Sequence, residues 1–403
     1  MKKNKIFFIY NFRYKKFDLF KIKCYFKRME FIKNIFSFLI VAGAIQGIFL
    51  SIILFTRKNG NKKANIVLAI ILLLFSISIT HTLIFINTHF LLPNSTKIGE
   101  PFQLLFGQLF YIYVNYLIFP DFKLKPKYLL FLLPFLIFFI FIFAYYTYFF
   151  IQNDLTNRII NVIIWIFILI NNWTFLILSY RIIIRHQKTI KQNFSNIDKI
   201  NLEWLKYFIK FLALCYIIYF LLIPILVHQV DPSTHFNKLV IFILSILIYG
   251  IGYKSLTQPE IFNGINEIVI IKEIEISSKT SKKYEKSSLS DLEIEEGMKK
   301  LEKLIETKKL FKDPELTLSD LAKELDISTH NLSQMINATG TNFFDFINYY
   351  RIEEFKNYLK DPKNLEKFTL LSLALDAGFN SKATFNKAFK KNMGMTPSEY
   401  LKR

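Results

Sequence analysis

Two short segments near the C-terminus carry hydrogen-bonding side chains on one face and apolar side chains on the other. In residues 329–337, Leu332, Met335 and Ile336 lie at helical spacing and predict the buried face. Amide, hydroxyl and imidazole groups opposite them are suited to base edges and phosphates of DNA. The residues expected to contact DNA here are Thr329, His330, Asn331, Ser333, Gln334 and Asn337.

The second segment, residues 382–391, repeats this pattern with more positive charge. From its start to the C-terminus the chain carries six Lys or Arg against one acid. This segment should therefore attract phosphates more strongly, while the first should read relatively more by hydrogen bonds. Its buried face is predicted to hold Ala383, Phe385, Ala388 and Phe389. Its DNA-facing residues are expected to be Ser381, Lys382, Thr384, Asn386, Lys387, Lys390 and Lys391.

Capping signals make each segment the second helix of a helix–turn–helix pair. Thr317 and Asp320 have the spacing of a capping box, and Ser328 can cap the helix that begins at 329. In the second pair, Thr369 is expected to cap residues 370–377, and Gly378 supplies the positive φ that ends that helix. Another capping box, Thr396-Pro397-Ser398-Glu399, precedes the C-terminus.

A longer helix, residues 343–359, joins the two pairs. We expect Arg351 to link the pairs by a salt bridge and not to touch DNA. The core residues predicted on this helix are Phe344, Ile347, Ile352, Phe355 and Leu359.

These motifs together resemble the DNA-binding domain of the AraC/XylS family of bacterial transcription regulators. The resemblance covers residues 313–403 and rests on residues 321–333, 377–391 and 394–400. It implies that each recognition helix enters one of two successive major-groove segments, and it implies RNA polymerase as a partner. Where the closing Tyr of the family is commonly followed by Arg, this chain has Leu401-Lys402-Arg403.

Membrane-length apolar segments precede this domain. Hydrophobic residues make up 52% of the chain, more than a soluble protein can cover, and a span needs about 20 apolar residues. The sequence predicts a seven-span bundle within residues 29–256. The spans are expected at 31–55, 64–86, 101–119, 128–151, 159–180, 211–227 and 236–253, the last being the weakest.

Loop charge predicts the orientation of the bundle. Basic residues concentrate in the first, third and fifth loops, and the even loops hold few. With seven spans, the N-terminus then lies outside the cell and the C-terminal domain lies in the cytoplasm. We expect a multi-pass protein of the bacterial inner membrane. The net charge of +21 fits nucleic acid or anionic lipid as a partner.

The first 28 residues conflict with this orientation. They carry ten Lys or Arg and a single acid, Asp18, yet the topology places them outside. They lack the uncharged core of a signal peptide. We expect either that translation starts at Met29 or that residues 1–28 form a disordered basic leader.

Polar residues within the spans are candidates for a ligand pocket. Gln108, Tyr111 and Asn115 share one helix face. The alternative is hydrogen bonding between helices, and the lack of acids within the spans argues against an ion-coupled pump. The candidate pocket residues are His81, Gln108, Tyr111, Asn115, Asn171 and Asn172.

Between the bundle and the DNA-binding domain, residues 257–290 are predicted to form a flexible linker rich in Ser and Lys. Residues 291–312 are predicted to form a linker helix with one apolar seam, which either packs on the domain or pairs with a second copy. The seam residues are Ile294, Met298, Leu301 and Ile305.

The interpretation is an all-α protein, a seven-helix transmembrane bundle followed by a cytoplasmic double helix–turn–helix domain. Its layout resembles membrane-bound AraC/XylS members of Bacteroidetes-type bacteria. We expect a sequence-specific transcription regulator that couples a membrane or extracytoplasmic signal to promoter binding. The alternative is a transporter or lipid-binding membrane protein with a regulatory DNA-binding tail. A third interpretation has the bundle as an anchor from which proteolysis frees the tail.

Neither an enzyme nor a cofactor is expected, because the sequence shows no phosphate-binding glycine loop and no nucleophile–base pair. Its two cysteines, Cys24 and Cys215, have no metal-ligand spacing. The expected partners are double-stranded promoter DNA, the lipid bilayer, a small-molecule or lipid signal, RNA polymerase and a second copy of the chain.

Overall fold

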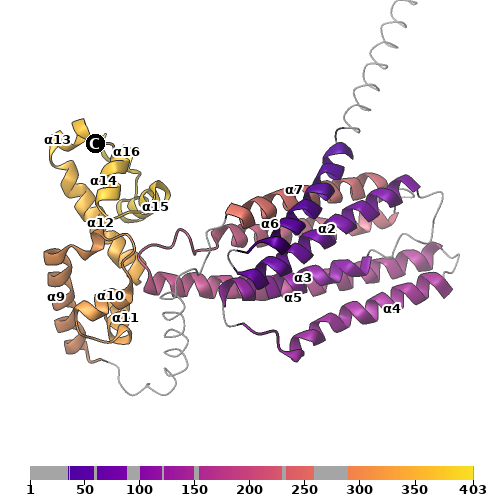
Figure 1. The fold of residues 1–403 in the computed structure, drawn as a ribbon, viewed down its shortest axis with the longest axis horizontal. Coiled ribbons are helices and arrows are strands. Elements are labelled where there is room, and N and C mark those ends of the chain that lie inside the picture. Colours follow the sequence, from indigo (N-terminus) through magenta and orange to yellow (C-terminus); the bar gives the residue numbers. More distant parts are fainter. Residues whose placement is uncertain are drawn as a thin grey trace, which may run out of the picture. The chain divides into compact units, whose positions relative to one another are not determined.

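The computed structural model describes residues 35, 37–58, 61–88, 100–119, 122–148, 154–228, 233–257 and 289–402 (Figure 1). These residues are almost entirely helical, and they include no strand beyond one isolated β-bridge. The chain divides into two compact units, each described here by itself. The first comprises Met1–Tyr113, Lys123–Leu176 and Ala213–Thr257; the second comprises Val114–Phe122, Ile177–Leu212 and Gln258–Arg403.

The first unit contains the apolar helices. They are a helix over Ser37–Thr56, α2 (Lys62–Thr88), η2 (Glu100–Gln103), α3 (Leu104–Ile118), η3 (Pro126–Leu132), α4 (Leu133–Tyr148), α5 (Asp154–Asn193), α6 (Glu203–His228) and α7 (Ser233–Thr257), of which α3, α5 and α6 continue into the second unit.

Three of the described helices are long and apolar enough to cross a membrane, over Ser37–Thr56, Lys62–Leu83 and Val162–Asn193. Among the described residues, shorter apolar stretches lie within α3, across η3 and α4, and within α7, at Leu104–Ile118, Leu130–Phe141 and Ile241–Lys254. The 3-10 turns η2 and η3 lie at the starts of two predicted spans. The structure thus supports three candidate spans, and the count of seven stays a prediction.

Small residues let the helices of the first unit approach closely. A Cβ at Gly43 would lie 2.5 Å from the Cβ of Ser245 on α7, and one at Gly47 would lie 2.1 Å from Oγ of Ser76 on α2. Such contacts are typical of helix pairs in membranes, where van der Waals packing replaces the hydrophobic effect. The helix over Ser37–Thr56 is therefore held against both α2 and α7.

The second unit contains the C-terminal helices. They are α9 (Asp291–Lys308), η4 (Leu310–Lys312), α10 (Leu318–Glu324), α11 (Thr329–Ala338), α12 (Phe343–Leu359), α13 (Pro362–Lys367), α14 (Leu370–Asp376), α15 (Lys382–Met393) and α16 (Pro397–Tyr400).

Helix α12 passes through two hydrophobic cores. Its first half contributes Ile347 to a core with α9, α10 and α11, and its second half contributes Phe355 to a core with α14 and α15. Figure 1 shows α12 between these two groups of helices. One predicted core residue was wrong: Phe344 is only half-buried, while Phe343 and Phe346 are buried. These two face the first core, so the core-facing side of the helix starts one residue earlier than predicted.

Helix α9 packs on the first of these cores. A capping box between Ser290 and Glu293 starts it, and Leu301 and Ile305 on its seam are fully buried. The helix ends at Lys309, whose φ of 48° is left-handed, and the chain continues as the short helix η4. The predicted linker helix is thus two helices separated by a turn.

Several expectations fall outside the described residues. They concern the leader 1–28, the start at Met29 and most of the flexible linker, 258–288.

Candidate nucleic-acid interface

Helix α11 is oriented by its cap and its buried face. A capping box between Thr317 and Asp320 starts α10, and Ser328 Oγ accepts the backbone N–H of Asn331 at 3.1 Å to start α11. Both caps confirm the predictions. The predicted inward residues Leu332, Met335 and Ile336 are buried, so the polar face of α11 points away from the core.

The outward face of α11 is unevenly exposed. Thr329, His330 and Asn337 are exposed, whereas Asn331, Ser333 and Gln334 are half-buried. Asn337 Nδ2 donates to Ser333 Oγ at 3.3 Å. Oε1 of Gln334 is buried with no hydrogen-bond partner among the described residues. Because this oxygen is buried, Gln334 would reach a base edge only after its side chain changes rotamer.

Helix α15 presents the more basic surface. Ser381 Oγ accepts the N–H of Thr384 at 3.1 Å and starts the helix, while Phe385 and Phe389 are buried. The prediction that Ala383 packs inward was wrong, because it lies two residues from Phe385, on the opposite side of the helix, and is exposed. The exposed polar residues are Lys382, Asn386, Lys387, Lys390 and Lys391, and Thr384 is half-buried.

Not all of these lysines are equally available to DNA. Nζ of Lys391 lies 2.6 Å from the carboxylate of Asp345 on α12. This pair holds α15 against α12. Lys391 is therefore a weaker candidate for a phosphate contact than Lys390 and Lys382.

Arg351 on α12 is a buried charge with carbonyl partners. Its side chain donates to the main-chain oxygens of Phe311 at 2.7 Å, Asp313 at 2.8 Å and Ser195 at 3.0 Å. The predicted salt bridge was wrong: the guanidinium is held by backbone dipoles, which can approach its planar fork from several sides. Burial lowers its pKa to about 10, and the charges of Asp313 and Glu315 partly oppose this shift. Arg351 stays charged at neutral pH.

The same guanidinium reaches the second helix pair. It lies over the ring of Phe379 at 5.9 Å from the centroid. The preceding Gly378 has a φ of 104°, and a Cβ there would lie 2.4 Å from the carbonyl oxygen of Phe311. The predicted positive φ is confirmed, and it comes with a close approach that only glycine allows. The turn of the second pair is thus packed directly against η4.

A cluster of charges at Glu354 makes a second link between η4 and α12. Its buried carboxylate lies 2.9 Å from Nζ of Lys309 and 2.8 Å from Nζ of Lys312. Burial alone would raise the pKa of Glu354, but the hydrogen bonds and charges of the two lysines outweigh it, so the pKa lies below its usual value. The ionised carboxylate therefore stabilises the domain at neutral pH.

Sequence analysis missed two acids that contact α15. Asp198 accepts a hydrogen bond from the hydroxyl of Thr384, and Glu203 lies 3.5 Å from Nζ of Lys387. Asp198 lies in the connection between α5 and α6, and Glu203 is the first residue of α6; this stretch was noted only for its bases. Two acids within a strongly basic stretch were the signal that could have indicated a specific ionic contact.

In the first unit, the predicted pocket residues make hydrogen bonds between helices. Asn172 Oδ1 on α5 accepts the N–H of Gly107 at 2.9 Å, and Asn171 Nδ2 donates to the carbonyl of Leu104 at 3.0 Å. Gln108 is fully buried, with Nε2 3.4 Å from Asn171 Oδ1. The structure thus brings these three polar side chains together where α3 meets α5.

The other predicted pocket residues lie differently. The ring of Tyr111 contacts those of Phe131 and Phe175, Asn115 is buried further along α3, and His81 is half-buried on α2. Tyr111 therefore belongs to an aromatic cluster rather than to the amide group.

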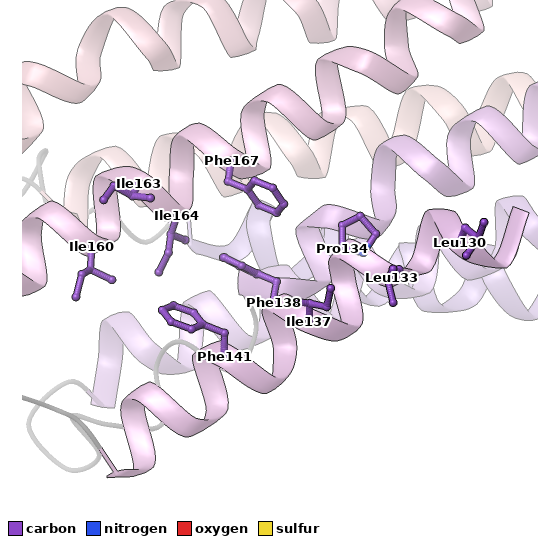
Figure 2. A pocket seen from close by; sticks show the side chains of 10 residues that line it. All are labelled: Leu130, Leu133, Pro134, Ile137, Phe138, Phe141, Ile160, Ile163, Ile164 and Phe167. Carbon is purple, nitrogen blue, oxygen red and sulfur yellow. The ribbon is translucent and has the colours of Figure 1, made fainter.

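The first unit does hold a pocket of about 570 Å³, but other residues form it. It opens between α4 with its preceding turn η3 and the first half of α5 (Figure 2). Phe138 and Phe167 approach each other across it, with ring centroids 5.7 Å apart. Its walls are almost wholly apolar, so it suits a hydrocarbon ligand. The lining residues are Leu130, Leu133, Pro134, Ile137, Phe138, Phe141, Ile160, Ile163, Ile164 and Phe167.

Comparison with known proteins identifies the C-terminal domain. Residues 321–403 match a helix-turn-helix domain family. The transcriptional activator NphR of a Rhodococcus species is 26% identical over 116 residues, which are 29% of this chain and 33% of that relative. The chain thus spans about a third of the length of this curated relative. No solved structure matches. The C-terminal domain is an AraC-type helix–turn–helix domain, which supports a DNA-binding transcription regulator.

Proposed function

We propose that the protein is a membrane-bound, sequence-specific transcription regulator. The observation that carries this proposal is the presence in one chain of two helix–turn–helix pairs and of helices long enough to cross a membrane. The apolar unit senses a membrane or extracytoplasmic signal, and the C-terminal domain binds a promoter in the cytoplasm. Seven spans, with the N-terminus outside, remain part of the proposal.

DNA is read by the outward faces of α11 and α15. On α11 the groups that read base edges are Asn331 and Gln334, which offer amides, with His330 and Thr329 at the N-terminal end of the helix. On α15, Lys387 and Lys390 contact phosphates. Among the described residues no group of His, Cys, Asp or Glu could hold a metal ion, and proteins of this domain family are typically not enzymes.

The apolar pocket favours a second role for the first unit, that of a lipid-binding module whose occupancy is the signal. A pocket lined by ten apolar side chains can take an acyl chain or a similar hydrophobic molecule. The polar group at Gln108 and Asn171 is instead used to join α3 to α5.

The experiment that tests the proposal is sequencing of genomic DNA captured by the full-length protein in detergent micelles. We expect enrichment of discrete promoter sites, and we expect the enrichment to disappear when Asn331 and Gln334 are both replaced by Ala. Equal capture of all sequences, or no capture by the intact protein, would remove the proposed function. Fractionation of cells would separately place the full-length chain in the membrane or outside it.

A further inference from the structure

Residues 194–203, here called the α5–α6 segment, are anchored on the C-terminal domain. Phe194 forms an antiparallel bridge with Thr317, and the N–H of Ser195 donates to the carbonyl of Leu316 at 3.2 Å. Ser195 is completely buried, and its hydroxyl and carbonyl accept hydrogen bonds from Arg351. Main-chain pairing of this kind fixes the position of the segment relative to the domain.

The segment also has a defined shape of its own. Nε2 of His186 lies 2.9 Å from the carbonyl oxygen of Ile200, and Gln187 Nε2 donates to the carbonyl of Asn201 at 2.8 Å. Ile197, Ile200 and Leu202 are buried. The segment is therefore a folded turn on the end of α5, which fixes the positions of exposed Asp198 and half-buried Glu203.

Two of these acids contact DNA-facing groups of α15. The carboxylate of Asp198 accepts a hydrogen bond from the hydroxyl of Thr384, and that of Glu203 pairs with Lys387. Thr384 and Lys387 are three residues apart and therefore share one face of the helix. A hydroxyl and an ammonium group are also the donors that bind DNA phosphates. The carboxylates thus take the place that two phosphate oxygens would take.

The two recognition helices differ in whether the α5–α6 segment contacts their DNA-facing residues. The polar contacts of the segment reach residues 314–317, Arg351 and α15, while Thr329 and His330 of α11 remain exposed. Lys387 is still 74% exposed and its pair with Glu203 is long, so the contact is weak enough to be displaced.

We infer that the α5–α6 segment is a tethered competitor of DNA for the second recognition helix. With the segment in place, α11 is open and α15 is covered on its phosphate-binding side. Binding of both helices to DNA requires the acids to leave, because carboxylates and phosphates repel each other. The inference rests on the proposed function. It also gives a signal a covalent route to the domain, because α5 and α6 both continue into the first unit.

The test compares DNA binding by three full-length proteins in detergent micelles. They are wild type, Asp198→Ala with Glu203→Ala, and a control with Glu296→Ala and Glu366→Ala. The control removes two exposed acids of the same unit and so changes the net charge equally. The probe is a DNA duplex that the full-length wild-type protein captures from genomic DNA. If the wild type captures no specific sequence, the probe is a duplex captured by the Asp198/Glu203 variant. We expect the Asp198/Glu203 variant to bind about threefold to tenfold more tightly than the control, with a salt slope about one unit steeper.

Hydrogen exchange of the wild type, with and without the duplex, tests the competition directly. We expect amides of residues 196–203 to exchange faster when DNA is bound, while those of α15 exchange more slowly. The inference would be overturned if the Asp198/Glu203 variant and the control bound the duplex with equal affinity. It would also be overturned if amides of residues 196–203 stayed protected from hydrogen exchange in the DNA complex. Failure of all three proteins to select any sequence would instead remove the proposed function itself.

Discussion

Arg351 and Ser195 lie 156 positions apart in the chain and meet through two hydrogen bonds of 3.0 Å, Nη1 to the carbonyl oxygen and Nη2 to Oγ. Both residues are buried. The guanidinium also holds the carbonyls of Phe311 and Asp313, so one side chain joins the α5–α6 segment, η4 and α12. The core of the DNA-binding domain therefore includes a residue from the connection between two apolar helices.

Replacement of Arg351 by Met should strongly destabilise the second unit. It removes the donor of the buried carbonyl groups of Phe311 and Ser195, while the carbonyl of Asp313 still accepts the N–H of Leu316 at 3.3 Å. We expect a loss of about 3 kcal/mol or more in the free energy of unfolding. Arg351→Lys should recover little, because one ammonium group cannot serve carbonyls on several sides. Exposed Lys360, the residue that follows the last turn of α12, is the control, and Lys360→Met should change the free energy of unfolding by less than about 0.5 kcal/mol. Limited proteolysis at increasing urea concentration measures the difference.

Two glycines with positive φ should respond differently to alanine. Gly378 combines its φ of 104° with a Cβ position 2.4 Å from a carbonyl oxygen, whereas Gly340, at 77°, has nothing within 4 Å. Gly340→Ala should lower the free energy of unfolding by about 1 kcal/mol, because only the left-handed backbone is strained. Gly378→Ala should lower it by at least twice as much, because the new Cβ also collides with the carbonyl oxygen. Similar losses at both positions, measured by thermal unfolding, would show that the contact with Phe311 is unimportant.

The contribution of Glu354 should depend on pH. Its pKa lies below the usual value in the folded protein, so the stabilisation is present above the unfolded-state pKa and is lost as the pH falls through the folded-state value. Lys309 and Lys312 are 49% and 36% exposed, so solvent screening limits the effect of Glu354→Gln to about 1 kcal/mol at pH 7. Denaturant unfolding at pH 7 and below pH 4 should show this difference shrinking toward zero. A constant difference across this range would mean that the charge does not matter.

Lys387 and Lys390 should set the salt dependence of DNA binding. Each phosphate contact contributes about 0.9 to the slope of log affinity against log salt. Lys387→Ala combined with Lys390→Ala should flatten the slope by up to about 2 on every duplex, with little change in sequence preference. Lys363→Ala on α13 is the control and should leave the slope unchanged, as measured by fluorescence anisotropy at several salt concentrations. An unaltered slope in the double variant would exclude these phosphate contacts.

Asn331 and Gln334 should set sequence preference. Replacing either by Ala should weaken binding to the selected site by about 1–3 kcal/mol and leave binding to random duplexes nearly unchanged. Oε1 of Gln334 is buried and unpaired, so its loss should not destabilise the free protein. Competition assays with selected and random duplexes separate the two effects, and parallel losses on both would contradict base reading.

Local features of the DNA-binding domain were predictable from sequence because short-range chemistry determines them. The capping pairs at Thr317 and Thr396 and the left-handed Gly378 need only neighbouring residues, and the structure confirms all three. Periodicity was less exact on α12, where aromatic residues at 343, 344 and 346 make the buried face ambiguous by one position.

Long-range partners could not be predicted in the same way. The sequence around Arg351 does not indicate that its acceptors are the carbonyls of Phe311, Asp313 and Ser195. Every residue type has a main-chain carbonyl oxygen, so residue types do not show which carbonyl will accept a hydrogen bond. The contact of Asp198 with Thr384 is equally invisible to local patterns. In the first unit, hydropathy indicated apolar helices but not that two of the predicted spans would begin with 3-10 turns.

Helix α12 lies in both cores of the DNA-binding domain, and this makes the distance between α11 and α15 a property of the protein. DNA turns by about 34–36° with each base pair. Adding a single base pair between the two contacted stretches would therefore rotate one of them out of register with a domain that cannot adjust. If both helices contact DNA as proposed, the sites that the domain binds should share one spacing even where their bases differ.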